Sequence, residues 1–143
     1  MASFVPFNDF AAKVAAGSIN LTTAQLMLTL TTDANAPNPT DSVIGDLTPI
    51  SLANVVGNME LTTTSAAATD TNGFQVTVAD KQVTAGGGDV GPFQHAVVYV
   101  QGSGDLISMY DFGEELTIPD GTSMNFDFNQ STGLLRILFS PTP

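Results

Sequence analysis

Turn-forming residues divide the chain after Leu21 into short segments, and this spacing constrains the fold more than any other feature. Clusters of Gly, Pro, Asn and Asp recur about every 8–12 residues, and the segments between them are rich in β-branched and aromatic residues. The pattern predicts a mainly β fold, an antiparallel β-sandwich of about eight strands with a jelly-roll-like arrangement.

One helix is predicted, near the start of the chain. Asn8 is the expected N-cap, Phe10, Ala11 and Val14 fall at helical spacing, and Gly17 supplies a stop. Phe7 is expected to staple onto the first turn. Two roles remain open for this helix, either covering the core or acting as an arm that docks on a partner.

The 143 residues predict a single domain spanning 1–143. We expect a helix and arm over 1–20, the sandwich over 21–140 and a tail over 141–143. Residues 1–17 have no continuous apolar stretch, so a secretory signal is not expected. No segment reaches the roughly 18 apolar residues that cross a bilayer. We therefore expect a soluble protein made in a cytoplasm.

The first half of the predicted sandwich alternates strands with loops. "DANAPNPTD" (33–41) consists of turn-forming residues and predicts an exposed loop, and "SAAATDTNG" (65–73) predicts another. In "FQVTVAD" (74–80), Phe74, Val76 and Val78 are expected on one face, and Asp80-Lys81 is expected to form a bulge before "QVTA". Strands are predicted at "AQLMLTLTT" (24–32), "VIGDLTPIS" (43–51) and "MELTTTS" (59–65).

The stretch "TAGGGDVGPFQHAVVYV" (84–100) places the most flexible backbone directly before the most apolar strand. Glycines 86–88 allow a sharp reversal, and Pro92 biases Gly91 towards extended geometry. A phosphate-binding interpretation fails, because no helix follows the glycines. The strand 93–100 is apolar on both faces, as in a central strand covered on both sides. One predicted face holds Phe93, His95, Val97 and Tyr99, and the other holds Gln94, Ala96, Val98 and Val100.

The last third of the chain predicts a C-terminal hairpin. "DLISMYDFG" (105–113) reads as a strand ending at a turn, and "ELTI" (115–118) and the turn "IPDGTS" (118–123) follow. "MNFDF" (124–128) and "LLRILF" (134–139) are expected to pair across a loop at 130–133. The expected register joins Phe126 to Ile137, Phe128 to Leu135, and Asp127 to Arg136. The side chains expected to face inward are Met124, Phe126, Phe128, Leu135, Ile137 and Phe139.

The charge balance limits the possible partners. Three Lys and Arg residues oppose 14 Asp and Glu residues, giving a net charge of −11. Such a surface repels nucleic acids and anionic membranes, so neither is expected as a partner. With 43% hydrophobic residues, the chain is nevertheless expected to fold around a core.

The scarcity of lysine bears on the sheet edges, which proteins often protect with that residue. Only Lys13, Lys81 and Arg136 are basic. The edges are therefore defended by Asp, Pro and bulges, or they are covered by neighbouring subunits. Of these two, we favour coverage by neighbouring subunits.

His95 is the only histidine and the only candidate base for a Ser-His-Asp triad. Because it lies in mid-strand between apolar neighbours, we interpret it as a neutral core or interface histidine. Catalysis and a pH-sensitive contact are the alternatives, since an unperturbed histidine titrates at about pH 6.5. No catalytic, cofactor-binding or metal-binding residues are assigned, and no cofactor is predicted.

Three motifs resemble functional sites without meeting their requirements. "DFG" (111–113) lacks the other kinase motifs and is interpreted as a strand end turning on Gly113. "DTNG" (70–73) resembles the start of a calcium loop but lacks the later Glu, and an Asx turn accounts for it better. A solvated acidic rim, with a hard-cation site as the alternative, is expected from Asp111, Glu114, Glu115 and Asp120.

The order of these segments resembles a family of small virion structural proteins of tailed bacteriophages. The resemblance rests on "FVPFNDFAAKVAAGSINL", "QLMLTLTT", a Pro/Asn loop, "VIGDLTPIS", the "GG–GPF–AVVYV" passage, "LISMYDFG", "LTIPDGTSMNFDFN" and "GLLRIL". It implies a non-enzymatic capsid decoration protein on the virion surface, made in the host cytoplasm and bound to the major capsid protein. The N-terminal segment or the loop 33–41 would contact the shell, and copies would self-associate, as trimers or around local symmetry axes.

Other functions stay open from the sequence alone. A tail, collar or receptor-binding component would use the same fold with exposed loops for recognition. A carbohydrate-binding module or a small jelly-roll hydrolase belongs to a different class. With no Trp and two Tyr, a sugar-binding platform would rely on Phe, and a hydrolase would rely on His95 or a pair of carboxylates.

Overall fold

The computed structural model describes residues 5–69, 73–128 and 135–138 and confirms a mainly β, antiparallel, sandwich-like fold with one short helix. In these ranges no helix is long and apolar enough to cross a bilayer. The elements are β1 (Val5–Pro6), α1 (Phe10–Ala15), β2 (Leu26–Thr31), η1 (Asp33–Asn35), η2 (Ile44–Asp46), β3 (Thr63–Thr69), β4 (Gly73–Val78), β5 (Lys81–Thr84), β6 (Val90–Val100), β7 (Leu106–Ile118), β8 (Ser123–Phe126) and β9 (Leu135–Leu138).

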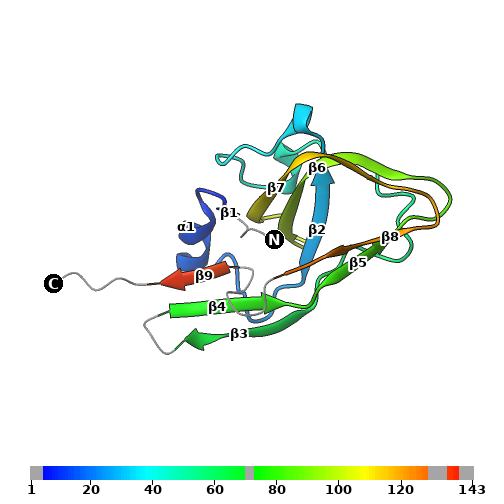
Figure 1. Cartoon of the computed structure of the whole chain (residues 1–143). Coiled ribbons are helices and arrows are strands. Elements are labelled where there is room, and N and C mark those ends of the chain that lie inside the picture. The colour runs from blue at the N-terminus through cyan, green and yellow to red at the C-terminus, as the bar shows by residue number, and fades with distance from the viewer. Residues whose placement is uncertain (1–4, 70–72, 129–134, 139–143) are drawn as a thin grey trace.

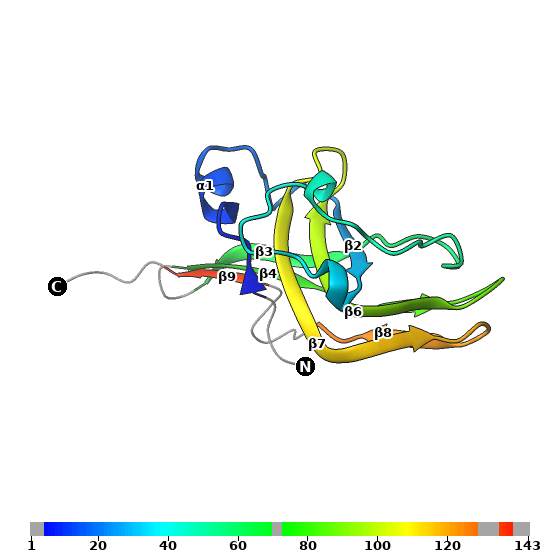
Figure 2. The same ribbon diagram turned by 90° about the horizontal axis from the view of Figure 1, so that it is seen from above.

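The strands form three antiparallel sheets with orders β1-β7-β6-β2, β3-β4-β9 and β5-β8. Figure 1 shows the four-stranded sheet standing over the layer formed by β3, β4 and β9, with β5 and β8 continuing that layer to one side. Figure 2 shows from above that β3, β4 and β9 extend to one side of the molecule and β8 to the other. The segment 59–61 links two of the sheets, because it is hydrogen-bonded to β2 at two positions. Just before β3, Leu28 donates to the carbonyl of Met59 (2.9 Å) and Leu61 donates to the carbonyl of Leu26 (2.9 Å). The chain thus leaves the edge of β2 and becomes the edge strand β3.

The main core lies between the layers. Alternation along β2 buries Leu26, Leu28 and Leu30 completely, and β4 contributes Val76 and Val78. A cluster of phenylalanines fills the region under β6 and β7, where the ring centroids of Phe93 and Phe126 each lie 5.9 Å from that of Phe112. The prediction for β4 is confirmed, although Phe74 is only partly buried.

The strand β6 is covered on both faces, as expected, but its alternation is interrupted. A register shift between Phe93 and His95 moves Phe93 onto the face of Ala96 and Val98 in the main core. Val97 packs on the opposite face with Phe7 and Leu106. The predicted face that joined Phe93 to Val97 is therefore wrong, because a bulge reverses the alternation.

The N-cap of helix α1 lies one residue later than predicted. Asp9 occupies the N-cap position and makes no side-chain capping bond, while Gly17 ends the segment with φ +81°, as predicted. Phe10 is buried and Val14 packs against the core, which supports the core-covering role. Phe7 does not act as a staple, since it packs instead against Val97 and Leu106.

The predicted C-terminal hairpin is wrong. β8 pairs with β5, so that Phe126 lies opposite Lys81, and β9 pairs with β4, so that Ile137 lies opposite Phe74. Arg136 pairs with Gln75, while Asp127 is exposed in the segment after β8. The predicted loop 130–133 lies outside the described residues. Phe126 and Phe128 are buried as predicted and Met124 packs against the core, so the inward pattern is confirmed for these three.

Other local predictions in the first half of the chain need correction. The segment 43–51 contains the short helix η2 and a single bridge from Val43 to Asp105, with no strand. β3 covers Thr63–Thr69, so most of the strand lies within the predicted loop 65–73. Asp80 does not form a bulge within one ladder, because β4 and β5 belong to different sheets.

Two predicted strands at 105–118 form one strand, β7. Gly113 lies inside this strand with φ +80°, so the "DFG" segment is a bulge and its interpretation as a strand end is wrong. The turn at 118–123 is confirmed by the hydrogen bond from the Thr122 amide to the Pro119 carbonyl (3.0 Å).

Close packing explains why flexible backbone precedes the buried part of β6. Gly87 (φ +83°) and Gly88 (φ +152°) make the reversal before the strand, as predicted. Gly91 lies within β6 with φ +127°, and a Cβ placed there would approach the Leu116 carbonyl to 2.8 Å. The neighbouring strand β7 therefore leaves no room for a side chain at this position.

Gly91→Ala is expected to lower the free energy of unfolding by about 2 kcal/mol or more, because it combines positive φ with backbone overlap. Gly45→Ala is the matched control, since φ at Gly45 is not positive and a Cβ there would meet nothing within 4 Å. The control should change stability by less than about 0.5 kcal/mol. Urea unfolding followed by circular dichroism measures both, and equal stability of the two variants would contradict this account.

Candidate functional site

His95 lies on β6 with 7% of its surface exposed, at the wall of a cavity of about 420 Å³. Its Nε2 atom lies 3.0 Å from Oδ1 of Asp33 in η1, and its Nδ1 atom lies 4.0 Å from Oδ1 of Asp111 on β7. The cavity is lined by Val5, Pro37, Pro39, His95, Met109, Tyr110 and Asp111. The only histidine therefore joins β6 to the exposed loop 33–41.

The geometry of His95 differs from that of a catalytic triad. An ionised carboxylate only accepts hydrogen bonds, so Nε2 carries the proton that is donated to Asp33. A triad needs the second ring nitrogen to face a nucleophilic hydroxyl, whereas Nδ1 of His95 faces the carboxylate of Asp111. This arrangement favours the interpretation of His95 as a structural contact that holds the loop 33–41 against the sheet.

Asp111 is held in place by donors from two strands. Its Oδ1 atom accepts a hydrogen bond from the Gly113 amide (2.7 Å) and another from Nε2 of Gln94 (3.1 Å). These bonds, the Gly113 amide first, hold the pKa of the Asp111 carboxyl below its ordinary value, and nearby His95 acts in the same direction. The "DFG" segment thus uses its aspartate to fix the bulge in β7.

The other acidic candidates do not converge on a site. Glu114 and Glu115 are exposed on β7, and Asp120 lies in the following turn, where its amide donates to Oδ1 of Asp89 (2.8 Å). Within residues 5–69, 73–128 and 135–138, no group of three or more His, Cys, Asp or Glu residues is placed to hold a metal ion. Three residues of the "DTNG" motif, 70–72, lie outside the described part of the chain.

Lys13 forms a polar network that was not predicted from the sequence. Its Nζ atom donates to the Ser42 carbonyl (2.7 Å) and to Oδ1 of Asp105 (2.9 Å) and lies 3.5 Å from Oδ2 of Asp9. The side chains of Lys13 and Asp105 are 18% and 13% exposed. This network fastens α1 to the segment after the loop 33–41 and to the start of β7. The i,i+4 spacing of Asp9 and Lys13 is the only signal of it in the sequence.

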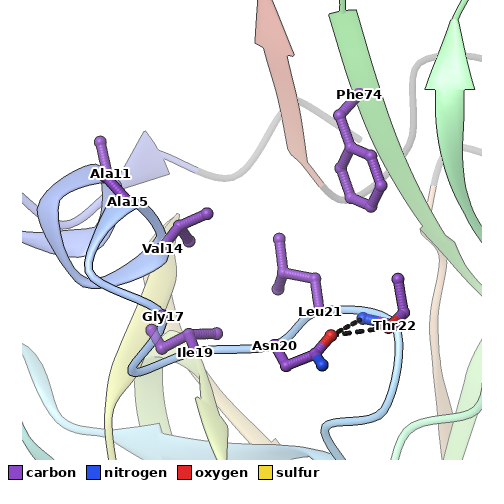
Figure 3. A pocket seen from close by; sticks show the side chains of 9 residues that line it. All are labelled: Ala11, Val14, Ala15, Gly17, Ile19, Asn20, Leu21, Thr22 and Phe74. Atoms are coloured by element: carbon purple, nitrogen blue, oxygen red, sulfur yellow. Dashed lines mark hydrogen bonds between the residues drawn. The ribbon is translucent and has the colours of Figure 1, made fainter.

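A second cavity, of about 640 Å³, lies between α1 and β4 (Figure 3). Its lining is mostly apolar and consists of Ala11, Val14, Ala15, Gly17, Ile19, Asn20, Leu21, Thr22 and Phe74. Figure 3 shows the Asn20 side chain turned towards Thr22, whose amide and hydroxyl it accepts at 3.1 and 2.6 Å. The polar groups nearest this groove are therefore engaged with each other, which leaves an apolar surface without a reactive group.

Lys13→Met is expected to lower the free energy of unfolding by about 1–3 kcal/mol, because it leaves the partly buried Asp105 carboxylate without its cation. Lys81→Met removes the same charge from β5, where no ion pair joins Lys81 to the described residues, and should cost less than about 0.5 kcal/mol. Chemical denaturation at pH 7 measures the difference, and equal losses in both variants would contradict the role of the network.

Asp111→Asn is expected to flatten the dependence of stability on pH in acid. A carboxyl whose pKa is lowered in the folded state stabilises the fold above the ordinary aspartate value, and this contribution is lost as the pH falls below about 4. The variant lacks this titration, so its free energy of unfolding should fall less steeply between pH ~4 and ~2. Unfolding curves across this range measure the slope, and identical slopes would show that the hydrogen bonds do not stabilise the charged form.

Comparison of the chain with protein-family models, with curated proteins and with solved structures found no match.

Proposed function

We propose that this chain is a non-enzymatic structural protein of a tailed-bacteriophage virion, a capsid decoration protein that binds the major capsid shell. The proposal starts from the order of strand and turn segments, which resembles that family. Its strongest structural support is the position of the two segments expected to contact the shell.

The N-terminal segment and the loop 33–41 lie side by side. The Asn8 amide donates to the Pro39 carbonyl (2.9 Å), and Val5, Pro37 and Pro39 line the same cavity. Val5 is 55% exposed although it pairs with Met109 of β7, so its side chain is available to contact another molecule. The two segments thus form one contact surface, defined here as Val5, Pro37 and Pro39 and called the shell-binding surface.

Two fixed contacts make this surface suitable for docking. His95 holds η1 through Asp33, and Lys13 holds the segment that follows the loop through the Ser42 carbonyl. A surface that is already ordered loses less conformational freedom on binding. Nonpolar residues at its centre suit a contact with another protein, and the net charge of −11 disfavours binding to packaged DNA.

The nearest alternative is a tail, collar or receptor-binding component of the same particle, and copy number distinguishes the two. A hydrolase would depend on His95, whose ring nitrogens both face carboxylates, or on a pair of carboxylates, and a carbohydrate-binding module would lack tryptophan. Neither of these alternatives has a specific observation in its favour.

Virus particles purified from cells that carry the gene are expected to contain the chain on the shell in hundreds of copies, in proportion to the subunits of a symmetric shell. Val5→Asp should reduce its occupancy at least about tenfold, because the carboxylate would be desolvated in the contact. Val56→Asp is the matched control, since Val56 is 61% exposed but lies far along the chain, beside β5.

Quantitative mass spectrometry and a density map of the particle measure copy number and position. About a dozen copies or fewer would assign the chain to the tail or collar, because a symmetric ring there contains few subunits. Absence from the particle would overturn the proposal, and equal occupancy of the two variants would overturn the assigned shell-binding surface.

A further inference from the structure

Several sheet edges of this protein are closed by neighbouring segments or by charge. Of the remaining edge strands in the described residues, which are β3, β8 and β9, β3 is the longest. The free side of β2 is hydrogen-bonded to 59–61, and the free side of β5 is bonded to 54–56 through the Val56 amide and the Thr84 carbonyl (2.9 Å). β1 has two residues, and β7 carries three exposed carboxylates and the bulge at Gly113. These are the usual ways in which a protein prevents its edges from pairing with other chains.

The strand β3 has none of these protections over Ser65–Thr69. It forms the edge of the three-stranded sheet β3-β4-β9, and its residues 65–69 pair one to one with β4. The strand reads TTSAAAT, without charge or proline, and Ser65, Ala67 and Ala68 are exposed. In Figure 1 it lies at the lower margin of the molecule, with β4 on its inner side. No segment in the described ranges is hydrogen-bonded to its outer side.

We propose that β3 is a self-association edge, through which two copies of this chain pair antiparallel in register about Ala67. An antiparallel edge is self-complementary, because a twofold axis brings each strand opposite an identical one. With the axis at Ala67, Ser65 lies opposite Thr69 and Ala66 lies opposite Ala68. The paired strands would join two three-stranded sheets into one continuous sheet.

The distribution of charge favours a second copy of this chain as the partner and β3 as the contact. Each copy carries a net charge of −11, so approach through most of the surface is opposed by like charges. β3 is uncharged and its side chains are small, so two copies meet there without placing like charges opposite each other. A partner protein of opposite charge would favour the acidic part of β7 instead, where Asp111, Glu114 and Glu115 are exposed.

The pairing goes beyond the proposed virion role and can be measured on the purified chain without any particle. A single paired edge buries less than the roughly 800 Å² per partner of a stable dimer, so we expect weak association in dilute solution. Copies held close together on a surface would pair much more readily, because their effective concentration is high.

A cysteine cross-link tests the register directly, because the chain contains no cysteine of its own. In the proposed pairing the two Ala67 Cα atoms lie about 4.5–5.5 Å apart, within the range that a disulfide spans. Ala67→Cys is therefore expected to form a disulfide-linked dimer under mild oxidation, while Ala53→Cys, at an exposed loop position, stays monomeric. Equal cross-linking of the two variants would overturn the proposed register.

Ala67→Lys tests the pairing without a covalent bond. It places two ammonium groups opposite each other while making the net charge of each copy less negative, so a general charge effect would increase association. At about 1 mM, where an interface of millimolar affinity is substantially populated, light scattering should show dimers for wild type and for Ala53→Lys. Ala67→Lys should be monomeric at the same concentration, with an unchanged circular dichroism spectrum.

The proposal is overturned if wild type is monomeric at that concentration, or if Ala67→Lys pairs as well as wild type. If Ala67→Lys loses its folded circular dichroism signal, Ala67→Cys is compared with Ala53→Cys under reducing and oxidising conditions instead. An oxidised dimer that forms only with Ala67→Cys supports the proposal, and the absence of that dimer rejects it. Failure of particle binding in the same variants would not change either result, so the two proposals are tested separately.

Discussion

The structure depends on hydrogen bonding along the edges of its sheets, which a chain with three basic residues must satisfy mainly with its own backbone. Segments 54–56 and 59–61 lie along β5 and β2 and supply this pairing. The second of these segments continues directly into β3, so closing one sheet creates the edge of the next. The sandwich is therefore held together by shared strands as well as by the leucine, valine and phenylalanine core between its layers.

Features encoded by neighbouring residues could be predicted from the sequence, whereas pairings between distant segments could not. The β-sandwich class, the strand β2, the alternation of Val76 and Val78 and the turn at 118–123 all follow from local patterns. The predicted C-terminal hairpin was wrong because short apolar strands with similar alternation fit several partners, and β8 and β9 pair with β5 and β4 instead of with each other. The bulges in β6 and β7 also reverse side-chain alternation without a clear sequence signal, which placed Phe93 on the wrong face.

In the candidate sites, too, local features could be predicted from the sequence and contacts between distant segments could not. Burial of His95 was expected from its apolar neighbours, but Asp33 and Asp111 come from segments that only the tertiary fold brings together. Lys13 meets Ser42 and Asp105 for the same reason, 29 and 92 residues away in sequence. Both contacts end at or near the loop 33–41. A loop whose composition predicted exposure is therefore anchored by two polar contacts, which give it a defined shape.

The pairing of β9 with β4 has a consequence for biosynthesis. β4 is the central strand of its sheet, and its partner on one side, residues 135–138, is made about 60 residues later, as Phe74 and Ile137 show. A ribosome therefore has to add Leu138 before this sheet can be completed, and until then β4 offers an open edge to other nascent chains. Crowding of unfinished chains on a polysome would favour misassembly at this edge during the interval between the synthesis of β4 and that of residues 135–138.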